Sequence, residues 1–220
     1  MKYPSLFEEK KLWRKGFKKV ACLDEAGRGP LSGPVVAAAV IIKDKKLNRA
    51  KLLRLNLDSI KDSKKLTPKR REELYKILTN PLRQLADGGP QIEWGMAKVS
   101  EKVIDKINIL EATKLAMKRA VEKLSKRPNF LILDGKMKLD LPIPQKSIIK
   151  ADEKVFSCSV ASIIAKVSRD RIMLRYHKKF PQYRFDLHKG YPTELHFKML
   201  KKYGPCKIHR KSFKPLKKSN

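Results

Sequence analysis

The sequence has few cysteines, and their number and spacing exclude two kinds of small, cross-linked domain. The three cysteines, Cys22, Cys158 and Cys206, are odd in number and lie far apart. A disulfide framework needs paired cysteines, and a structural zinc site needs closely spaced ligands. We therefore expect free thiols, as in proteins of the reducing cytoplasm, which is where we expect this chain to reside.

Long apolar runs are also missing. No stretch reaches the roughly 18 apolar residues that span a bilayer, and the N-terminus lacks the charged, apolar and cleavage regions of a signal peptide. We therefore expect no membrane span and no secretion signal. Hydrophobic residues still make up 41% of the chain, which is enough for a folded core and argues against wholesale disorder.

Acidic residues are scarce relative to basic ones. The chain has 22 Asp and Glu against 53 Lys and Arg, which gives a formal net charge of +31. Such a charge repels itself in the folded state and is typical of proteins that bind a polyanion, either nucleic acid or a membrane surface. Residues 201–220 contain eight basic residues and no acid, and a flexible basic tail is expected from about residue 215.

The pattern of apolar residues predicts a single α/β domain over residues 1–220. Apolar, β-branched runs predict these strands: 18–24, 35–42, 91–98, 130–135 and 147–152. The sequence also predicts these helices: 5–16, 67–78, 101–125, 153–180 and one near 193–203. The helix at 67–78 is predicted from its start, where Thr67 can act as N-cap and Pro68 occupies the first helical position. Ser100 can cap the helix at 101–125, which is either one helix or two joined near Asn108. The strand after it is expected to lie parallel to a neighbour, because a helix crosses over between them.

Three of the predicted strands end in acids: Asp24 with Glu25, then Asp134, then Asp152. Taken singly, such acids are most often solvated turn residues. Acids at the carboxyl ends of neighbouring strands converge, however, and carboxylates are ligands for Mg²⁺ or Mn²⁺. Two such ions about 3.5–4 Å apart can stabilise the attacking and leaving oxygens of a phosphodiester. Asp24 and Glu25 can share this site only if their strand ends there, because adjacent strand residues face opposite ways.

Other residues are weaker candidates for nucleic-acid contacts. Gly27, Arg28 and Gly29 form a loop whose backbone N–H groups could bind a phosphate. Lys64 is most simply a solvated charge, but it lies in a basic loop of the kind that contacts phosphates. Tyr191 could stack on a base or sugar, although a single tyrosine is more often a packing residue.

Several stretches of this sequence resemble the ribonuclease HII family, the type 2 ribonucleases H, in their bacterial form. The matching stretches are DEAGRGPLSGPVVAAAVI at 24–41, DSKKLTPKRREELY at 62–75, INILEATKLAMKRAV at 107–121, LDGKMKLDLPIP at 133–144, KADEKVFSCSVASIIAKVSRDRIM at 150–173, FPQYRFDLHKGYPTELH at 180–196 and HRKSFKP at 209–215. The resemblance implies a ribonuclease-H-like fold: a mixed five-stranded sheet flanked by helices, with a helical C-terminal part.

The resemblance also implies an activity. The family hydrolyses the RNA strand of RNA–DNA hybrids and nicks DNA on the 5′ side of an embedded ribonucleotide. The products carry a 3′-hydroxyl and a 5′-phosphate, and the mechanism uses two divalent ions, Mg²⁺ or Mn²⁺. We therefore expect a monomeric endoribonuclease whose partner is such a hybrid or a DNA duplex with an embedded ribonucleotide.

The resemblance assigns a role to each candidate. Asp24, Glu25, Asp134 and Asp152 would be the catalytic, metal-binding acids. The remaining residues would bind the substrate. Gly27, Arg28 and Gly29 would recognise the 2′-hydroxyl and the adjoining phosphate, Lys64 would contact a phosphate, and Tyr191 would stack on the sugar beside the RNA–DNA junction. A side chain introduced at Gly27 or Gly29 is expected to impair cleavage and to spare the fold.

Two alternative functions would also fit this composition. A non-catalytic nucleic-acid-binding protein would explain the basic surplus alone. An enzyme of the same fold that acts on DNA, such as a junction resolvase or a transposase, would also need clustered acids. Metal-dependent cleavage at a ribonucleotide separates the first alternative from the expected function, and cleavage of all-DNA duplex would favour the second.

Overall fold

The computed structural model describes residues 4–43, 47–54, 57, 60, 66–80 and 91–216. The strands are β1 (Val20–Ala26), β2 (Val35–Ile42), β3 (Ile92–Val99), β4 (Phe130–Asp134) and β5 (Gln145–Ile148). The helices are α1 (Phe7–Arg14), α2 (Arg49–Arg54), α3 (Pro68–Thr79), α5 (Glu101–Glu122), α6 (Ala151–Lys154), α7 (Phe156–Lys179), the 3-10 helix η1 (Pro181–Tyr183), α8 (Phe185–His188) and α9 (Glu194–Tyr203). Within these ranges, every helix is too short or too polar to cross a membrane.

The strands form one mixed sheet in the order β3-β2-β1-β4-β5. β1 pairs antiparallel with β2, and β2 with β3, while β4 lies parallel to both β1 and β5. The fifth strand, β5, covers residues 145–148, so it begins earlier and is shorter than the expected strand at 147–152. The predicted five-stranded α/β architecture and the parallel strand after the long helix are confirmed.

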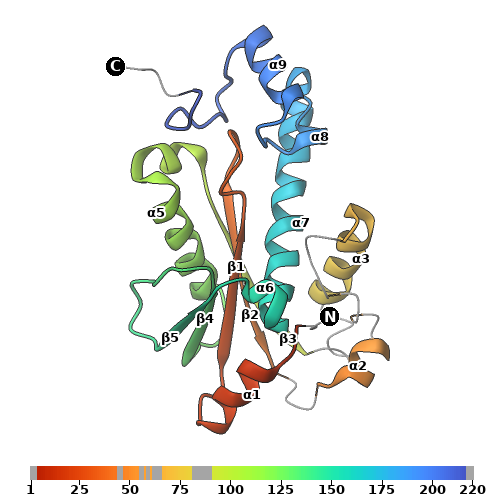
Figure 1. The fold of residues 1–220 in the computed structure, drawn as a ribbon, viewed down its shortest axis with the longest axis vertical. Coiled ribbons are helices and arrows are strands. Elements are labelled where there is room, and N and C mark those ends of the chain that lie inside the picture. Colours follow the sequence, from red (N-terminus) through yellow and green to blue (C-terminus); the bar gives the residue numbers. More distant parts are fainter. Residues whose placement is uncertain are drawn as a thin grey trace.

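Helices cover both faces of the sheet (Figure 1). Alternate residues of β1 point to opposite faces, so that Ala21 and Leu23 pack toward α5 and Cys22 packs toward α7. α3 lies on the α7 side, where Leu74 and Leu78 are fully buried. α7 therefore covers the face of β1 to which Cys22 and Asp24 belong.

α5 contains a break at Asn108. Its φ of 66° and ψ of 169° are not helical, and its Oδ1 accepts hydrogen bonds from the N–H groups of Leu110 and Glu111 at 2.9 and 3.1 Å. The side chain thus caps the second half of α5, which confirms the alternative of two helices joined near Asn108. Ser100 precedes the first half in an extended conformation but makes no side-chain capping bond.

The C-terminal part packs over the loop between β1 and β2 (Figure 1). Leu31 of that loop donates its N–H to the carbonyl of Gly190, and its own carbonyl accepts from the N–H of Arg210. η1, α8 and α9 make this part helical, as expected. Segments far apart in the sequence therefore meet at the end of the sheet where β1 leads into residues 27–34, which we call the glycine-rich loop.

Candidate active site

Three carboxylates from three different elements converge where β1 and β4 end. Asp24 belongs to β1, Asp134 ends β4, and Asp152 lies in α6. One carboxylate oxygen of each lies within 4.8 Å of those of the other two. Asp24 and Asp152 are buried, whereas Asp134 is partly exposed. The expected convergence of acids is confirmed for these three residues.

The parallel pairing of β1 with β4 explains why Asp24 and Asp134 meet. Leu23 and Leu133 are partners across the two strands, so the next residue on each strand is an acid. Because side chains alternate along both strands in step, both acids point to the face that α7 covers. The Asp24 carboxylate also accepts a hydrogen bond from the N–H of Glu25 at 2.7 Å, which fixes its orientation.

Asp152 reaches the cluster from a helix, which corrects the expectation of a third strand that ends in an acid. β5 ends at Ile148, and the chain then turns through Lys150, which has a left-handed φ of 55°. α6 begins at Ala151, whose N–H donates to Oδ1 of Asp134 at 2.7 Å. This bond ties the start of α6 to the end of β4, and it places Asp152 beside the other two acids.

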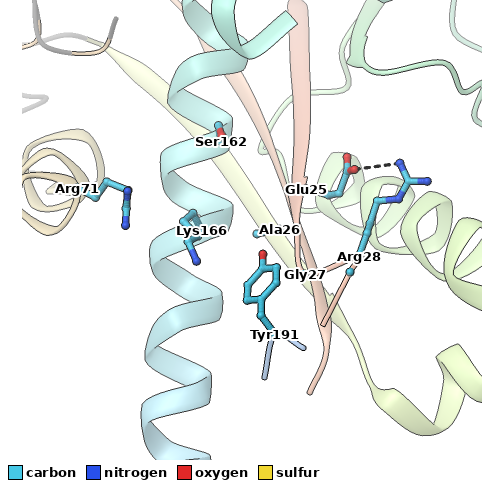
Figure 2. A pocket seen from close by; sticks show the side chains of 9 residues that line it. Glu25, Ala26, Gly27, Arg28, Arg71, Ser162, Lys166 and Tyr191 are labelled. Carbon is cyan, nitrogen blue, oxygen red and sulfur yellow. Dashed lines mark hydrogen bonds and ion pairs between the residues drawn. The ribbon is translucent and has the colours of Figure 1, made fainter. Parts of the chain in front are cut away.

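Glu25 lies on the other side of β1. The expectation that the strand ends at the acids is wrong, because β1 continues to Ala26, which pairs with Val36 of β2. Asp24 and Glu25 therefore face opposite ways. Oε1 of Glu25 accepts from Nη1 of Arg28 at 3.4 Å (Figure 2). Among the described residues, the acids within 4.8 Å of one another do not include Glu25, so its role as a metal ligand stays a prediction.

The acid cluster concentrates negative charge in a poorly hydrated space. Burial, followed by the negative charges of Glu25 and Asp134, raises the pKa of Asp24 well above its usual range. A hydrogen bond with Ser162 opposes this effect without reversing it. A divalent cation would relieve both the repulsion and the cost of burial. Three carboxylates are a donor set that suits hard cations such as Mg²⁺ and Mn²⁺.

A buried arginine from the C-terminal segment holds the glycine-rich loop. Arg210 has no exposed surface. Its Nη2 donates to the carbonyl of Gly27 at 2.6 Å, its Nη1 to that of Arg28 at 2.9 Å, and its Nε to that of Gly33 at 3.0 Å. Burial lowers the pKa of Arg210 to about 9, so the side chain remains charged at neutral pH.

Arg169 of α7 binds the other half of the same loop. It is also fully buried, and it donates to the carbonyls of Ser32 at 3.1 Å and Pro34 at 3.0 Å. Its Nη1 reaches the carbonyl of Lys189 at 3.0 Å, in the segment that carries Tyr191. Arg169 therefore joins the glycine-rich loop to the tyrosine segment.

A pocket brings the predicted substrate-binding residues together (Figure 2). Its lining consists of Glu25, Ala26, Gly27, Arg28, Gly29, Arg71, Ser162, Lys166 and Tyr191. Tyr191 is 37% exposed, and its ring centre lies 5.5 Å from Nζ of Lys166 and 5.6 Å from Cζ of Arg169. Lys64 lies outside the described residues. Arg71 of α3, which the sequence did not single out, contributes positive charge to the pocket.

The model of the family described as Ribonuclease HII matches residues 21–216, which is most of the chain. The chain belongs to the ribonuclease HII family. Membership makes it a ribonuclease H, a hydrolase that acts on RNA–DNA hybrids, and decides against the non-catalytic alternative. Enzymes of this kind need divalent metal ions.

Individual members of the ribonuclease HII family are similar over nearly the whole chain. The ribonuclease HII of Chlamydia trachomatis serovar A is 48% identical over 221 residues, covering 97% of this chain and 93% of that protein. The ribonuclease HII of Caldicellulosiruptor bescii is 45% identical over 205 residues, covering 93% and 91%. The crystal structure of the ribonuclease H2 from Pyrococcus horikoshii OT3 superposes with a TM-score of 0.67 at 29% identity, covering 90% and 95%. These similarities confirm the fold that the resemblance implied.

Sequence reasoning missed the residues that hold the glycine-rich loop in place. Arg169 and Arg210 fall inside stretches that resemble the family, but a charged residue on a basic chain is normally expected at the surface. The only available signal was that loops with several glycines leave backbone carbonyls to be satisfied. That signal does not say which side chain satisfies them.

Gly27 and Gly29, whose substitution was expected to spare the fold, differ in the space available for a side chain. Gly27 has a φ of 99°, and a Cβ there would lie 2.1 Å from Nε of Arg169 and 2.8 Å from the carbonyl oxygen of Pro34. Gly29 does not have a positive φ, and among the described residues no atom lies within 4 Å of the corresponding Cβ. The expectation therefore fails for Gly27, where a side chain disturbs the buried arginine.

We predict that Gly27→Ala lowers the free energy of unfolding by about 2–4 kcal/mol, from backbone strain and overpacking. Gly29→Ala should leave it within about 0.5 kcal/mol of the wild type, as for an exposed substitution. Urea denaturation of the two variants checks this difference. Equal stabilities would contradict the close approach of Arg169 to Gly27.

Proposed function

We propose that the chain nicks DNA on the 5′ side of an embedded ribonucleotide, and also cleaves RNA in hybrids, leaving a 3′-hydroxyl and a 5′-phosphate. The observation that carries the proposal is that β1 contributes Asp24 to the acid cluster and then leads directly into the glycine-rich loop that lines the pocket. Asp24 precedes Gly27 by three residues, so the groups that would bind metal and the groups that would bind sugar belong to one segment.

Asp24, Asp134 and Asp152 would hold the divalent ions, and Glu25, which follows Asp24 and lines the adjoining pocket, would be the fourth ligand. The buried, mutually repelling carboxylates fit such ions. Two bound Mg²⁺ or Mn²⁺ ions would stabilise negative charge on the attacking and leaving oxygens. The hydrogen bond from the N–H of Ala151 to Asp134 would keep that carboxylate pointing into the site.

The backbone of the glycine-rich loop is suited to bind the 2′-hydroxyl and the neighbouring phosphate. In a trans peptide, the N–H of one residue points opposite to the carbonyl of the residue before it. Arg210 binds the carbonyls of Gly27 and Arg28 from the protein interior. The N–H groups of Arg28 and Gly29 therefore point away from Arg210, on residues that line the pocket. A 2′-hydroxyl is the group that distinguishes RNA from DNA.

Tyr191 would stack on the sugar beside the RNA–DNA junction, and Lys64 would contact a phosphate. The exposed ring of Tyr191 lies in the same pocket as Gly27, Arg28 and Gly29. Lys166 and Arg71 add positive charge to the pocket, where a phosphate would enter (Figure 2). These contacts would orient the ribonucleotide relative to the acids.

We predict that Tyr191→Ala lowers kcat/KM at an embedded ribonucleotide by roughly 5-fold to 150-fold, the range expected when a stacking contact worth about 1–3 kcal/mol is lost. Tyr191→Phe keeps the ring and should stay within about threefold of the wild type. Steady-state cleavage of a labelled duplex measures both. Equal losses in the two variants would show that the hydroxyl, not the ring, makes the contact.

The decisive experiment uses a duplex DNA with one ribonucleotide, labelled at its 5′ end. With Mg²⁺ or Mn²⁺, one product should appear, cut on the 5′ side of the ribonucleotide and carrying a 3′-hydroxyl that a polymerase can extend. With EDTA, no product should appear. The same duplex without the ribonucleotide is the control, and its cleavage would support the DNA-specific alternative instead. A hybrid that is cut while the embedded ribonucleotide is not would limit the activity to RNA tracts.

The proposal includes a monomer that works in the cytoplasm. Light scattering on the purified protein, with and without the duplex, tests the oligomeric state. A stable dimer that alone cleaves the duplex would contradict this part of the proposal.

A further inference from the structure

Three of the four histidines form a buried cluster next to the segment that carries Tyr191. His196, His209 and His188 are 0%, 2% and 8% exposed. The rings of His188 and His196 stack with centres 4.3 Å apart, and Phe185 packs edge-on against both. Neither the metal site nor the proposed substrate contacts use these side chains, yet each makes specific hydrogen bonds.

A relay of hydrogen bonds runs from the backbone of Cys206 through the rings of His209 and His196 to the carbonyl of Tyr191. The backbone N–H of Cys206 points at Nδ1 of His209 at 2.9 Å, and an N–H can only donate. The carbonyl of Cys206 also lies 3.2 Å from that Nδ1, but a proton on Nδ1 would face the closer N–H of Cys206, donor against donor. Nδ1 of His209 is therefore the acceptor, and the proton of a neutral His209 ring is on Nε2.

That assignment fixes the tautomer of the next ring. Nε2 of His209 lies 3.0 Å from Nε2 of His196, so one of these two nitrogens must donate and the other must accept. Because His209 donates, the proton of His196 is on Nδ1. Nδ1 of His196 lies 2.9 Å from the carbonyl oxygen of Tyr191, which can only accept. In this relay, each donor then faces an acceptor.

His188 holds the same segment from the other side. Its Nδ1 accepts from the N–H of Gly190 at 3.1 Å, and its carbonyl accepts from the N–H of Tyr191 at 2.9 Å. Its Nε2 then donates to the carbonyl of Tyr183 at 2.8 Å. Burial lowers the pKa of both His196 and His209 to about 4, so the rings are neutral at physiological pH, as the hydrogen bonds require.

We propose that His196 and His209 are positioning residues, which fix the backbone of Tyr191 so that its ring is held against the substrate pocket. The proposal rests on the proposed role of Tyr191 in binding the ribonucleotide. The relay begins at Cys206, four residues before Arg210, so one C-terminal segment orients both substrate-binding elements. Arg210 holds the glycine-rich loop, and the two histidines hold the tyrosine.

A spectroscopic test examines the relay without any activity measurement. Long-range ¹H–¹⁵N correlation spectra of the wild-type protein at pH 7 should show neutral rings with opposite tautomers, Nδ1–H for His196 and Nε2–H for His209. Assignment uses the single variants His196→Gln and His209→Gln. The same tautomer in both rings, or rapid exchange between tautomers in either, would overturn the relay.

A matched pair of variants then tests the consequence for activity. The amide of asparagine lies near the position of Nδ1, so His196→Asn can still donate to Tyr191 but loses the contact with His209. The amide of glutamine lies near the position of Nε2, so His196→Gln keeps the contact with His209 but loses the donor to Tyr191. We expect His196→Asn to retain kcat/KM within about threefold and His196→Gln to lose about tenfold, the loss expected for one hydrogen bond. Each variant breaks one bond of the relay. If His196 had only a structural role, the losses of kcat/KM in the two variants would therefore follow their losses of stability.

The closing experiment is a double-mutant cycle on cleavage at an embedded ribonucleotide. If His196 acts through Tyr191, His196→Gln should change kcat/KM less than twofold in the Tyr191→Ala background. The same tenfold loss in both backgrounds would overturn the proposal, as would wild-type kcat/KM in Tyr191→Ala. A wild-type protein that does not nick the duplex would instead disprove the proposed function, and the tautomers would still be observable.

Discussion

Asp24→Asn should lower the rate of cleavage at an embedded ribonucleotide by about 10³-fold or more, because the proposed role of Asp24 is to bind metal and a metal ligand contributes several kcal/mol to stabilising the transition state. The substitution keeps the shape of the side chain, and the amide oxygen can still accept from the N–H of Glu25. Binding of the duplex should be unchanged or tighter, because one negative charge is lost near the phosphates. Single-turnover cleavage with Mg²⁺, together with a binding titration in EDTA, measures the two effects separately.

The same variant should be more stable than the wild type when no metal is present. The carboxylates of Asp24, Asp134 and Asp152 lie within 4.8 Å of one another, and burial strengthens their repulsion. Like charges at about 4 Å repel by up to roughly 4 kcal/mol in surroundings of intermediate polarity. We expect Asp24→Asn to gain about 1–3 kcal/mol of unfolding free energy in EDTA at pH 8. With Mn²⁺ the difference should shrink or reverse, because the wild type binds the ion more tightly.

The exposed Asp140 provides a control for charge alone. Asp140→Asn removes one negative charge from the surface and should leave both cleavage and stability in EDTA near the wild-type values. If Asp24→Asn cleaves at the wild-type rate, Asp24 does not bind the catalytic metal. If it is no more stable than the wild type in EDTA, the acids do not repel one another as their proximity implies.

The part of the site that could be predicted from the sequence depends on regular strand pairing. Asp24 and Asp134 each follow an apolar run, and parallel neighbouring strands bring such ends together without further information. Asp152 was expected at the end of a strand, but its place depends on a left-handed residue, Lys150, and on the short helix that follows. A local turn of this kind leaves little trace in a hydrophobic pattern.

Glu25 shows why the end of a strand is harder to predict than its existence. Its neighbour Ala26 remains in β1 because it pairs with Val36 of β2, and this pairing is a tertiary contact. The glycines that follow favour a loop, but they do not say at which residue the ladder ends. The expectation that the strand ends at the acids failed for this reason, while the role of Glu25 as a metal ligand stays a prediction.

The buried cations were the least predictable feature. Lys and Arg are almost never fully buried unless they are paired, so the pattern offers no reason to place Arg169 or Arg210 in the interior. Their partners are backbone carbonyls of the glycine-rich loop, far away in the sequence. Which carbonyls need a donor becomes clear only when the loop has its three-dimensional shape.

Arg210→Met should destabilise the protein by about 3–5 kcal/mol, because it leaves carbonyl oxygens of the glycine-rich loop without their buried donor. The guanidinium binds three carbonyls at 2.6–3.0 Å, from Gly27, Arg28 and Gly33. Methionine matches much of the volume and removes the cost of burying a charge, which limits the loss. Urea denaturation of the metal-free protein measures the change.

Arg210→Lys should also be destabilised, although it keeps the charge. A lysine ammonium is a single point of contact and cannot reach three carbonyls that a planar guanidinium binds at once. Lys211 is the adjacent residue and is exposed, so Lys211→Met should stay within about 0.5 kcal/mol of the wild type. Stability equal to the wild type in both Arg210 variants would contradict the role of this side chain in holding the loop.

The catalytic consequence of Arg210→Lys should exceed its effect on folding. At temperatures where the variant is still folded, the N–H groups of Arg28 and Gly29 lose the fixed direction that the guanidinium imposes on their peptide planes. A displacement of about 1 Å at a positioned group can cost 10²-fold in rate, so we expect kcat/KM at an embedded ribonucleotide to fall by about that factor. Cleavage of a long RNA–DNA hybrid should fall less, because many ribonucleotides can bind in alternative registers. Equal losses on both substrates would mean that the loop supports the acids and does not read the 2′-hydroxyl.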